Sequence, residues 1–217
     1  MLLYVNGDSH CVGHGINEEF GMTNDDLRYI QIKNAPHPSN FNDSFGYAIA
    51  KHLNLPLVCQ ALSGSSIERT IRTTKQFVYQ SNKKVFLLVG FPAINREEWY
   101  FQNKWWQITE GSQDRYPKEL HIRFKNWLTN YDTNNYLIGR SILISNKITE
   151  FRNWLNSENI KHFLFSTIDP ILDLPNYSKY LTDHGIVPDQ WNHFKKDGHQ
   201  KWAEYVTPQI NDIICKR

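Results

Sequence analysis

The chain has few cysteines, and their placement excludes the usual sulfur-based frameworks. Of 217 residues only three are cysteine, namely Cys11, Cys59 and Cys215. An odd number of distant thiols forms neither a disulfide framework nor a C-x-x-C metal motif. We expect three reduced thiols, which are typical of a cytosolic protein.

Long apolar runs and one-sided charge are also missing. No stretch approaches the roughly 20 apolar residues that a membrane helix needs. The N-terminus is apolar for only four residues after Met1, which is too short for a secretory signal. The 24 lysines and arginines are scattered among 22 acids, so no basic stripe points to nucleic acid. We therefore expect a cytoplasmic protein that binds neither membrane nor nucleic acid.

What the chain does have is the composition of a folded protein. Hydrophobic residues make up 40% of it and aromatic residues 14%. Many aromatics lie in the middle of the chain, in Trp99-Tyr100-Phe101 and Trp105-Trp106. The length suits one domain, 1–217, with a sizeable core.

Short apolar runs alternate with stretches of helical periodicity. Runs of this length and composition predict buried strands, and apolar residues spaced three or four apart predict helices. The segments between them are rich in Asn, Asp, Pro and Gly, or in exposed aromatics, and predict loops. We expect strands at 2–5, 55–60, 84–90 and 162–166, helices at 45–53, 66–80, 117–130, 134–157 and 198–215, and loops at 16–43, 91–116 and 167–197.

This alternation predicts an α/β protein with a mainly parallel sheet covered on both faces. In such sheets ligands collect beyond the carboxyl ends of the strands. The segments that follow Val5, Gln60, Gly90 and Ser166 should therefore share one edge.

Four groups of residues fall on that predicted edge. They are Gly7-Asp8-Ser9-His10, Ser63-Gly64-Ser65-Ser66, the stretch 90–99 with Asn95 and Arg96, and Lys196-Asp197-Gly198-His199. Taken singly, each is an ordinary turn, helix cap or polar loop.

Taken together, the four groups match the needs of an activated serine. Such a serine requires a base within hydrogen-bond reach, a group that orients the base, and donors for the developing oxyanion. Ser9 supplies the hydroxyl, His199 the base and Asp197 a candidate orienting acid. The backbone N–H groups of Ser9 and Gly64 are candidate oxyanion donors.

In these motifs the chain resembles the SGNH (GDSL-like) hydrolases. The resemblance rests on G7-D8-S9, on Gly64, on Gly90 at the end of the third strand and on D197-x-H199, in the family's order. It implies a three-layer α/β/α sandwich with a flavodoxin-like sheet. It also implies a serine esterase or deacetylase that forms an acyl-enzyme through Ser9, His199 and Asp197, with neither metal nor cofactor.

Two departures from the family's pattern stand out. Pro92 occupies the place of the asparagine in the usual G-x-N-D block, so Asn95 or Arg96 is the candidate substitute for that oxyanion and substrate-binding amide. The last block is Asp197-x-His199 instead of D-x-x-H. Asp183 and Asp189 are reserve orienting acids, and His193 is a reserve base.

A fainter resemblance links the chain to signal-less SGNH-like proteins of tailed phages. It rests on the third block, G90-F-P-A-I-N-R96-E-E-W99. It suggests a viral origin, with the host cytoplasm or the virion as location, and a small or carbohydrate-linked ester as substrate.

Two alternatives stay open at this point. The altered G-x-N-D block also fits a non-catalytic or weakly active binding or structural module on the same fold, such as a virion component. The spacing of His10, Cys11 and His14 offers metal ligands, although a complete set is not evident. The sequence leaves the oligomeric state open.

Overall fold

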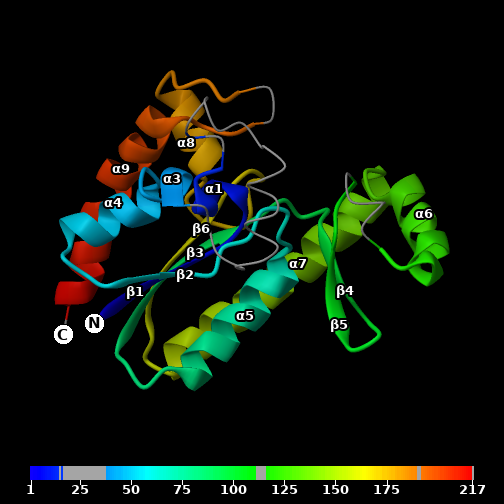
Figure 1. The fold of residues 1–217 in the computed structure, drawn as a ribbon, viewed down its shortest axis with the longest axis horizontal. Helices are drawn as coiled ribbons and strands as arrows, with labels where there is room; N and C mark the ends of the chain where they lie inside the picture. The colour runs from blue at the N-terminus through cyan, green and yellow to red at the C-terminus, as the bar shows by residue number, and fades with distance from the viewer. Residues whose placement is uncertain (15, 17–37, 111–115, 190–191, 217) are drawn as a thin grey trace.

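The computed structural model describes residues 1–14, 16, 38–110, 116–189 and 192–216 (Figure 1). Its strands are β1 Leu2–Asn6, β2 Leu57–Cys59, β3 Val85–Phe91, β4 Glu97–Phe101, β5 Lys104–Ile108 and β6 Lys161–Ser166. Its helices are α1 Ser9–Val12, α3 Pro38–Phe41, α4 Phe45–His52, α5 Ile67–Gln80, η3 Lys118–Leu120, α6 His121–Asn130, α7 Asn134–Ser157, α8 Tyr177–Asp183 and α9 Lys196–Cys215.

A parallel sheet of order β2-β1-β3-β6 forms the centre of the molecule. Leu3 of β1 pairs with Leu57 of β2 on one side and with Phe86 of β3 on the other. The strand order therefore reverses between β1 and β3, which is the place where sheets of this kind bind ligands. The predicted α/β class and parallel sheet are confirmed.

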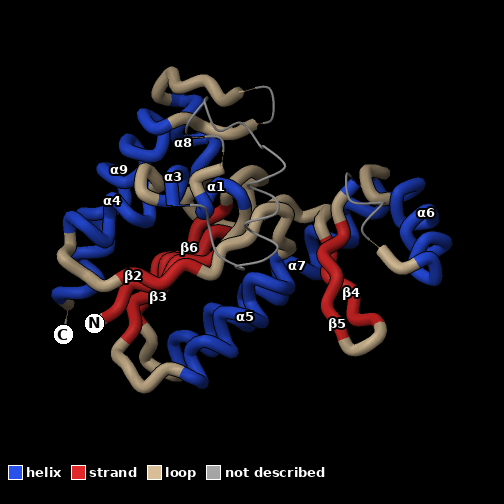
Figure 2. The backbone as a smooth tube through the Cα atoms, viewed as in Figure 1, coloured by secondary structure: helices blue, strands red, loops and turns tan. Residues whose placement is uncertain are grey.

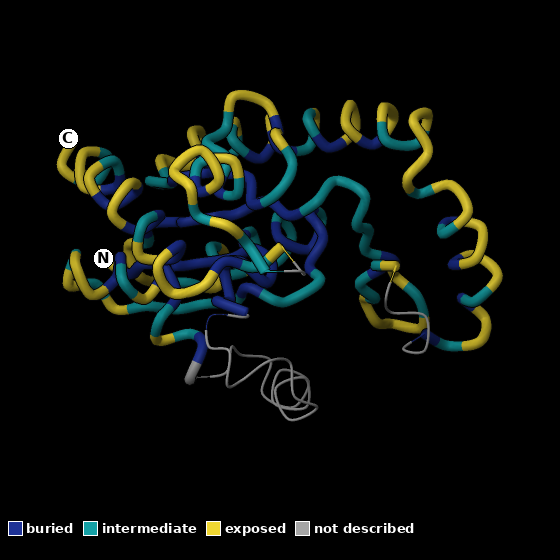
Figure 3. The backbone as a smooth tube through the Cα atoms, turned by 90° about the horizontal axis from the view of Figure 1, so that it is seen from above, coloured by how far each residue is buried: buried dark blue, intermediate teal, exposed yellow. Residues whose placement is uncertain are grey.

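Side-chain alternation along the strands creates two cores, one on each face of the sheet. Leu3 and Val5 of β1 point into the core formed with α4, α8 and α9, whereas Tyr4 points into the core formed with α5 and α7. Figure 2 shows these helices on opposite sides of the strands, and Figure 3 shows buried segments in the interior with exposed segments around them. The arrangement is a three-layer α/β/α sandwich.

The expectation of an irregular loop over 91–116 is wrong for its central part, which forms the antiparallel hairpin β4–β5. Gln102 and Asn103 make the two-residue turn, with φ of 50° and 59°, a conformation that suits asparagine and matches the twist of a hairpin. Residues 111–115 lie outside the described part. The hairpin and α6 project from the sheet (Figure 1), and their shared core consists of Trp99, Ile108, Tyr116, Leu120, Phe124 and Trp127.

The remaining boundaries are close to the expected ones, with three differences. The described end of the expected loop 16–43 contains the short helix α3, Pro38–Phe41. The helix expected at 134–157 is confirmed. The segment 167–197 contains α8, capped by the Asn176 side chain, which accepts from Lys179 N–H. Helix α9 begins at Lys196, two residues before the expected start. Most of the expected loop 16–43 lies outside the described residues. No helix in the described part is both long and apolar enough to cross a membrane.

Candidate active site

The segments that follow the four parallel strands meet at one edge of the sheet, as the sequence predicts. The segment after β2 joins the one after β1 through Leu62 N–H, which donates to the Gly7 carbonyl at 3.1 Å. The segment after β6 joins the end of β3 through Thr167 N–H, which donates to the Phe91 carbonyl at 2.9 Å.

The turn after β1 presents Ser9 at this edge. Gly7 has φ of 149°, and a Cβ there would lie 2.4 Å from Cys11 Sγ, so only glycine fits. Asp8 then caps the short helix α1 by accepting from His10 N–H at 3.1 Å. The tight turn and the cap fix the backbone on both sides of the serine.

Asp8 is fully buried, and its carboxylate is held by groups from two other segments. Arg96 Nη1 and Thr167 Oγ1 each donate to Asp8 Oδ2 at 3.1 Å. Removing one partner of a buried ion pair typically costs about 3–5 kcal/mol because the other charge is left uncompensated. Asp8 therefore ties the ends of β1, β3 and β6 together directly beside the serine.

Ser9 faces His193. The serine is 3% exposed, and its Oγ lies 2.9 Å from His193 Nε2, a separation at which a base can take the hydroxyl proton. The ring of His193 also packs against the rings of His10 and His14, with centroids 5.3 and 5.1 Å away. These contacts hold the imidazole toward the serine.

Asp189 shapes the segment that carries His193. Its Oδ1 accepts from the backbone N–H of His193 at 2.9 Å, and its own N–H donates to the His193 carbonyl at 2.8 Å. Within the described residues no hydrogen bond joins the Asp189 carboxylate to the imidazole. Asp189 therefore fixes the backbone of His193 and acts on the ring through its charge.

Burial lowers the pKa of His193 below the ordinary histidine value. The carboxylates of Asp189 and Asp8 act in the opposite direction, and the Arg96 guanidinium adds to the lowering. The imidazole is consequently neutral near pH 7. A neutral Nε2 facing a serine hydroxyl is able to accept its proton.

The predicted pairing of Ser9 with His199 is not what the structure contains. His199 is 1% exposed, its ring stacks on Phe45 at 5.5 Å, and its Nδ1 accepts from Phe45 N–H at 3.3 Å. Burial lowers its pKa to about 3. His199 is a neutral histidine of the core between α4 and α9.

Asp197 likewise does not orient His199. It is exposed, in the first turn of α9, and its Oδ1 accepts from Gly198 N–H at 2.8 Å. No hydrogen bond or ion pair connects these two described side chains. The physical reason is that α9 begins at Lys196, which places Asp197 on its outer side and His199 on its buried side.

Gly64 lies in the turn after β2, where the sequence predicts it. Its φ of 75° requires glycine, and the turn is close to that of Ser9 because Leu62 donates to Gly7. In the described part of the chain, neither Ser9 N–H nor Gly64 N–H has an acceptor. Backbone N–H groups with no acceptor among the described residues are the kind of donor that an oxyanion needs.

The third block places Arg96, and not Asn95, at the site. Pro92 has no N–H and an apolar ring, so it supplies no donor. Asn95 is partly exposed, and among the described residues its side chain makes no hydrogen bond. Arg96 reaches Asp8, and its charge acts on His193.

The described residues do not assemble the alternative metal site. The described residues contain no group of three or more His, Cys, Asp or Glu side chains that could hold a metal ion. His10 packs against Tyr177, with ring centroids 5.4 Å apart. Cys11 fills the space beneath Gly7, and burial raises its pKa well above the ordinary value.

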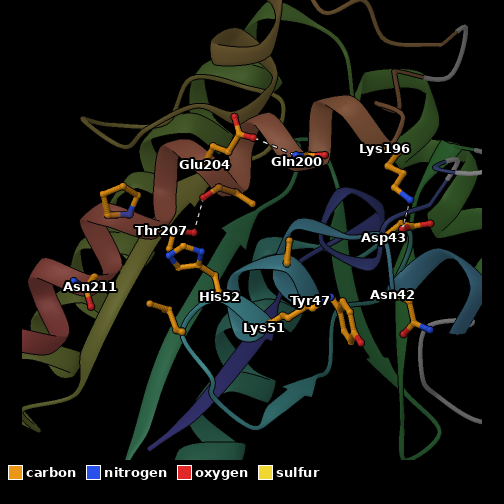
Figure 4. Close-up of a pocket in the computed structure, with 14 residues that line it drawn as sticks. Asn42, Asp43, Tyr47, Lys51, His52, Lys196, Gln200, Glu204, Thr207 and Asn211 are labelled. Atoms are coloured by element: carbon orange, nitrogen blue, oxygen red, sulfur yellow. Dashed lines mark hydrogen bonds and ion pairs between the residues drawn. The ribbon is translucent and has the colours of Figure 1, made fainter.

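A large open groove lies elsewhere, between α4 and α9 (Figure 4). It has a volume of about 1140 Å³, and neither Ser9, Gly64 nor His193 lines it. Polar side chains bridge its walls or lie along them, including an ion pair of 2.8 Å between Lys196 and Asp43. Because neither Ser9 nor His193 lines it, this groove is not the candidate active site.

Two site residues carried weak signals in the sequence. His193 precedes α9 in a loop, and only its nearness to the expected final helix made it a reserve base. Thr167 comes directly after β6, at a position that the shared edge predicts to be close, but a lone threonine there has no special signature. Its bond to Asp8 becomes visible only in the structure.

Comparison with known proteins gives structural matches. No protein-family model matches the chain, and no curated protein matches it. The chain is similar to a member of the lipolytic protein G-D-S-L family from Veillonella parvula, with 12% identity and a TM-score of 0.42 over 96% of this chain and 97% of that one.

Two esterases are matched to a similar degree. A family two carbohydrate esterase from Cellvibrio japonicus has 15% identity and a TM-score of 0.44, over 97% of this chain and 60% of that one. A psychrotrophic esterase from Pseudoalteromonas sp. has 10% identity and a TM-score of 0.40, over 98% of this chain and 93% of that one. The structural neighbours of this chain thus include G-D-S-L lipolytic proteins and carbohydrate esterases.

Proposed function

We propose that this protein is a serine ester hydrolase with Ser9 as nucleophile and His193 as general base. The observation that carries the proposal is the 2.9 Å separation between Ser9 Oγ and His193 Nε2. Three features support it: the neutral imidazole, the N–H groups of Ser9 and Gly64, which have no acceptor among the described residues, and the position of the site at the switch point of the sheet.

The reaction proceeds in two steps. His193 Nε2 takes the Ser9 hydroxyl proton while Oγ attacks the ester carbonyl carbon, and the same Nε2 then protonates the leaving alcohol as its C–O bond breaks. A water molecule next gives a proton to Nε2 as its oxygen attacks the acyl-serine carbonyl carbon. The acyl C–Oγ bond then breaks, Nε2 returns the proton to Ser9 Oγ, and the acid is released. A base of this kind contributes about 10²–10⁴ in rate.

The oxyanion formed in each step is stabilised by backbone donors. Ser9 N–H and Gly64 N–H are the two candidates, and the loss of one such donor costs about 10²–10³ in kcat. Arg96 stands in for the missing amide of the third block as a nearby positive charge. Because Arg96 Nη1 is bound to Asp8, its charge is held in place before substrate arrives.

The substrate we propose is a small or carbohydrate-linked ester, such as an acetyl ester. The hairpin β4–β5 is joined to the Gly64 turn because Ser66 N–H donates to Gln107 Oε1 at 2.9 Å. Further along the same hairpin, Tyr100 and Trp105 are 55% and 43% exposed. Exposed aromatic rings on an element fastened to the site suit contact with a sugar.

Labelling with a fluorophosphonate probe tests the proposal. We expect one adduct on Ser9 in the folded wild-type protein and none in Ser9→Ala. Hydrolysis of p-nitrophenyl acetate should disappear in Ser9→Ala and fall strongly in His193→Gln. Absence of both labelling and hydrolysis in the wild-type protein would overturn the proposal.

A second candidate is a binding module that uses the same site without turnover. One observation favours it: Asp189 accepts from the His193 backbone N–H, and among the described residues no carboxylate is hydrogen-bonded to the imidazole. A module of this kind would bind an acylated sugar equally well before and after Ser9→Ala, which calorimetry measures directly.

A further inference from the structure

Arg140 is a buried arginine of α7 that the chemistry above does not use. Its side chain is 8% exposed, and its guanidinium donates in three directions. Nη1 lies 2.8 Å from Glu68 Oε1, Nε donates to the Ile94 carbonyl at 3.2 Å, and Nη2 donates to the Arg96 carbonyl at 2.9 Å. One side chain thus joins α7, α5 and the segment after β3.

Two of these partners belong to segments that carry groups of the candidate site. Arg96 binds Asp8 through its own guanidinium while Arg140 holds its carbonyl. Glu68 lies in the first turn of α5, directly after the Gly64 turn. Arg140 therefore fixes the segment that carries Arg96 relative to the segment that carries Gly64.

The three-way contact depends on the planar fork of arginine. A lysine has a single ammonium at the end of its chain and cannot reproduce donors spread over a guanidinium. Without Arg140, the Glu68 carboxylate would lose its ion pair, and the Ile94 and Arg96 carbonyls would lose donors in a partly buried place. The segment that carries Arg96 would then be free to shift.

We propose that Arg140 is a positioning residue that holds Arg96 against Asp8 and thereby sets the geometry at Ser9. The kinetic part of this inference rests on the proposed ester hydrolysis. Displacing a site group by about 1 Å can cost roughly 10²-fold in rate, so a residue that touches no substrate can control turnover through Arg96.

The kinetic test compares Arg140→Met, Arg96→Met and the double variant. We expect Arg140→Met to lower kcat for p-nitrophenyl acetate about 10- to 100-fold with little change in KM. If Arg140 acts through Arg96, the double variant should lose no more than Arg96→Met alone. Arg152→Met is the matched control, because Arg152 lies on the same helix and pairs with exposed Asp173 at 2.9 Å; its kcat should equal the wild-type value.

A second readout needs no turnover. Charged and titratable side chains surround the His193 ring, namely Arg96, Asp8, Asp189, His10 and His14. Moving the Arg96 charge away should raise the pKa of His193, measured by NMR titration of the ring protons. We expect the rise in Arg96→Met and in Arg140→Met, and none in Arg152→Met.

The outcomes separate this inference from the proposed function. An inert wild-type protein that Ser9 probes do not label overturns the proposed hydrolysis, and the titration alone then decides the role of Arg140. The positioning role is overturned if the pKa of His193 keeps its wild-type value in Arg140→Met while it is raised in Arg96→Met. The positioning role is also overturned if the kcat losses of the two single variants multiply in the double variant. If Arg140→Met does not fold, Arg140→Lys serves in both measurements, with smaller changes in the same direction.

Discussion

Two histidines six positions apart in the chain have opposite surroundings. His193, in the loop before α9, is partly exposed and points its Nε2 at Ser9. His199, inside α9, is stacked on Phe45 in the core. An acid precedes each of them at short range, so local sequence does not tell them apart.

The difference between the two histidines arises from where α9 begins. His199 belongs to a stripe of helical spacing that faces the sheet, and the members of that stripe are His199, Trp202, Ala203, Val206 and Ile210. Such spacing places a residue in the core whatever its chemistry. His193 precedes the helix, so it can reach across the sheet edge to the segment after β1.

The largest expected effect separates the two histidines by activity. His193→Gln should lower kcat about 10²–10⁴-fold because it removes the proton acceptor of Ser9. His199→Gln should leave kcat within a few-fold of wild type, since the amide oxygen can still accept from Phe45 N–H. Initial rates on p-nitrophenyl acetate measure both, with His184→Gln as control, because His184 is exposed and directly follows α8. A large loss in His199→Gln with an intact fold would restore the sequence-based pairing.

The second prediction separates the two histidines by stability. Burial lowers the pKa of His199 to about 3 and that of His10 to about 4, whereas the unfolded chain takes up these protons near pH 6.5. Below pH 6.5, unfolding therefore binds protons, and stability falls by about 1.4 kcal/mol per pH unit for each group. The contribution of these two neutral histidines to stability is fully present above pH 6.5.

Urea unfolding between pH 7 and pH 5 checks this prediction. The free energy of unfolding of the wild-type protein should fall as pH falls, and His199→Gln should remove roughly half of the combined contribution of His199 and His10. An identical pH slope in the variant and the wild-type protein would show that His199 is not buried in its neutral form.

The comparison also shows which parts of the molecule the sequence predicts. The four strands of the sheet and their shared edge follow from short apolar runs, because a buried parallel strand has few other compositions open to it. The Ser9 turn and the Gly64 turn were predictable for the same reason, since each comes directly after such a strand. The absence of an amide donor at Pro92 was also visible in the sequence.

The base and the hairpin were not predictable with the same rules. The candidate base His193 contacts Ser9, 184 positions away in the chain, and no local pattern encodes such a distance. The hairpin has consecutive aromatics on both strands, so it lacks the simple alternation of a half-buried strand. Its turn at Gln102-Asn103 was the available signal, because asparagine tolerates positive φ.

A smaller effect concerns the pH dependence of activity. His193 must be neutral to accept a proton, and its pKa lies below the ordinary histidine value. The value of kcat/KM should therefore rise with pH to a midpoint below pH 6.5 and be level at pH 7. In His199→Gln the midpoint should stay within a few tenths of a unit. A midpoint well above 6.5 would contradict the desolvated position of His193.

The smallest expected effect concerns the acid beside the active histidine. In hydrolases whose aspartate bonds to the imidazole, replacing it by asparagine costs about 10⁴ in kcat. Here Asp189 accepts from the backbone N–H of His193, and an asparagine oxygen can keep that bond. We therefore expect Asp189→Asn to lower kcat less than about tenfold. The loss arises chiefly because the substitution removes the negative charge of Asp189, and in the wild-type protein that charge raises the pKa of His193. Asp189→Ala, which also loses the bond to the backbone, should cost more. If Asp189→Asn instead lowers kcat as much as His193→Gln does, the Asp189 carboxylate turns to the His193 ring when substrate binds. The activity of the base would then depend on the acid in its own loop.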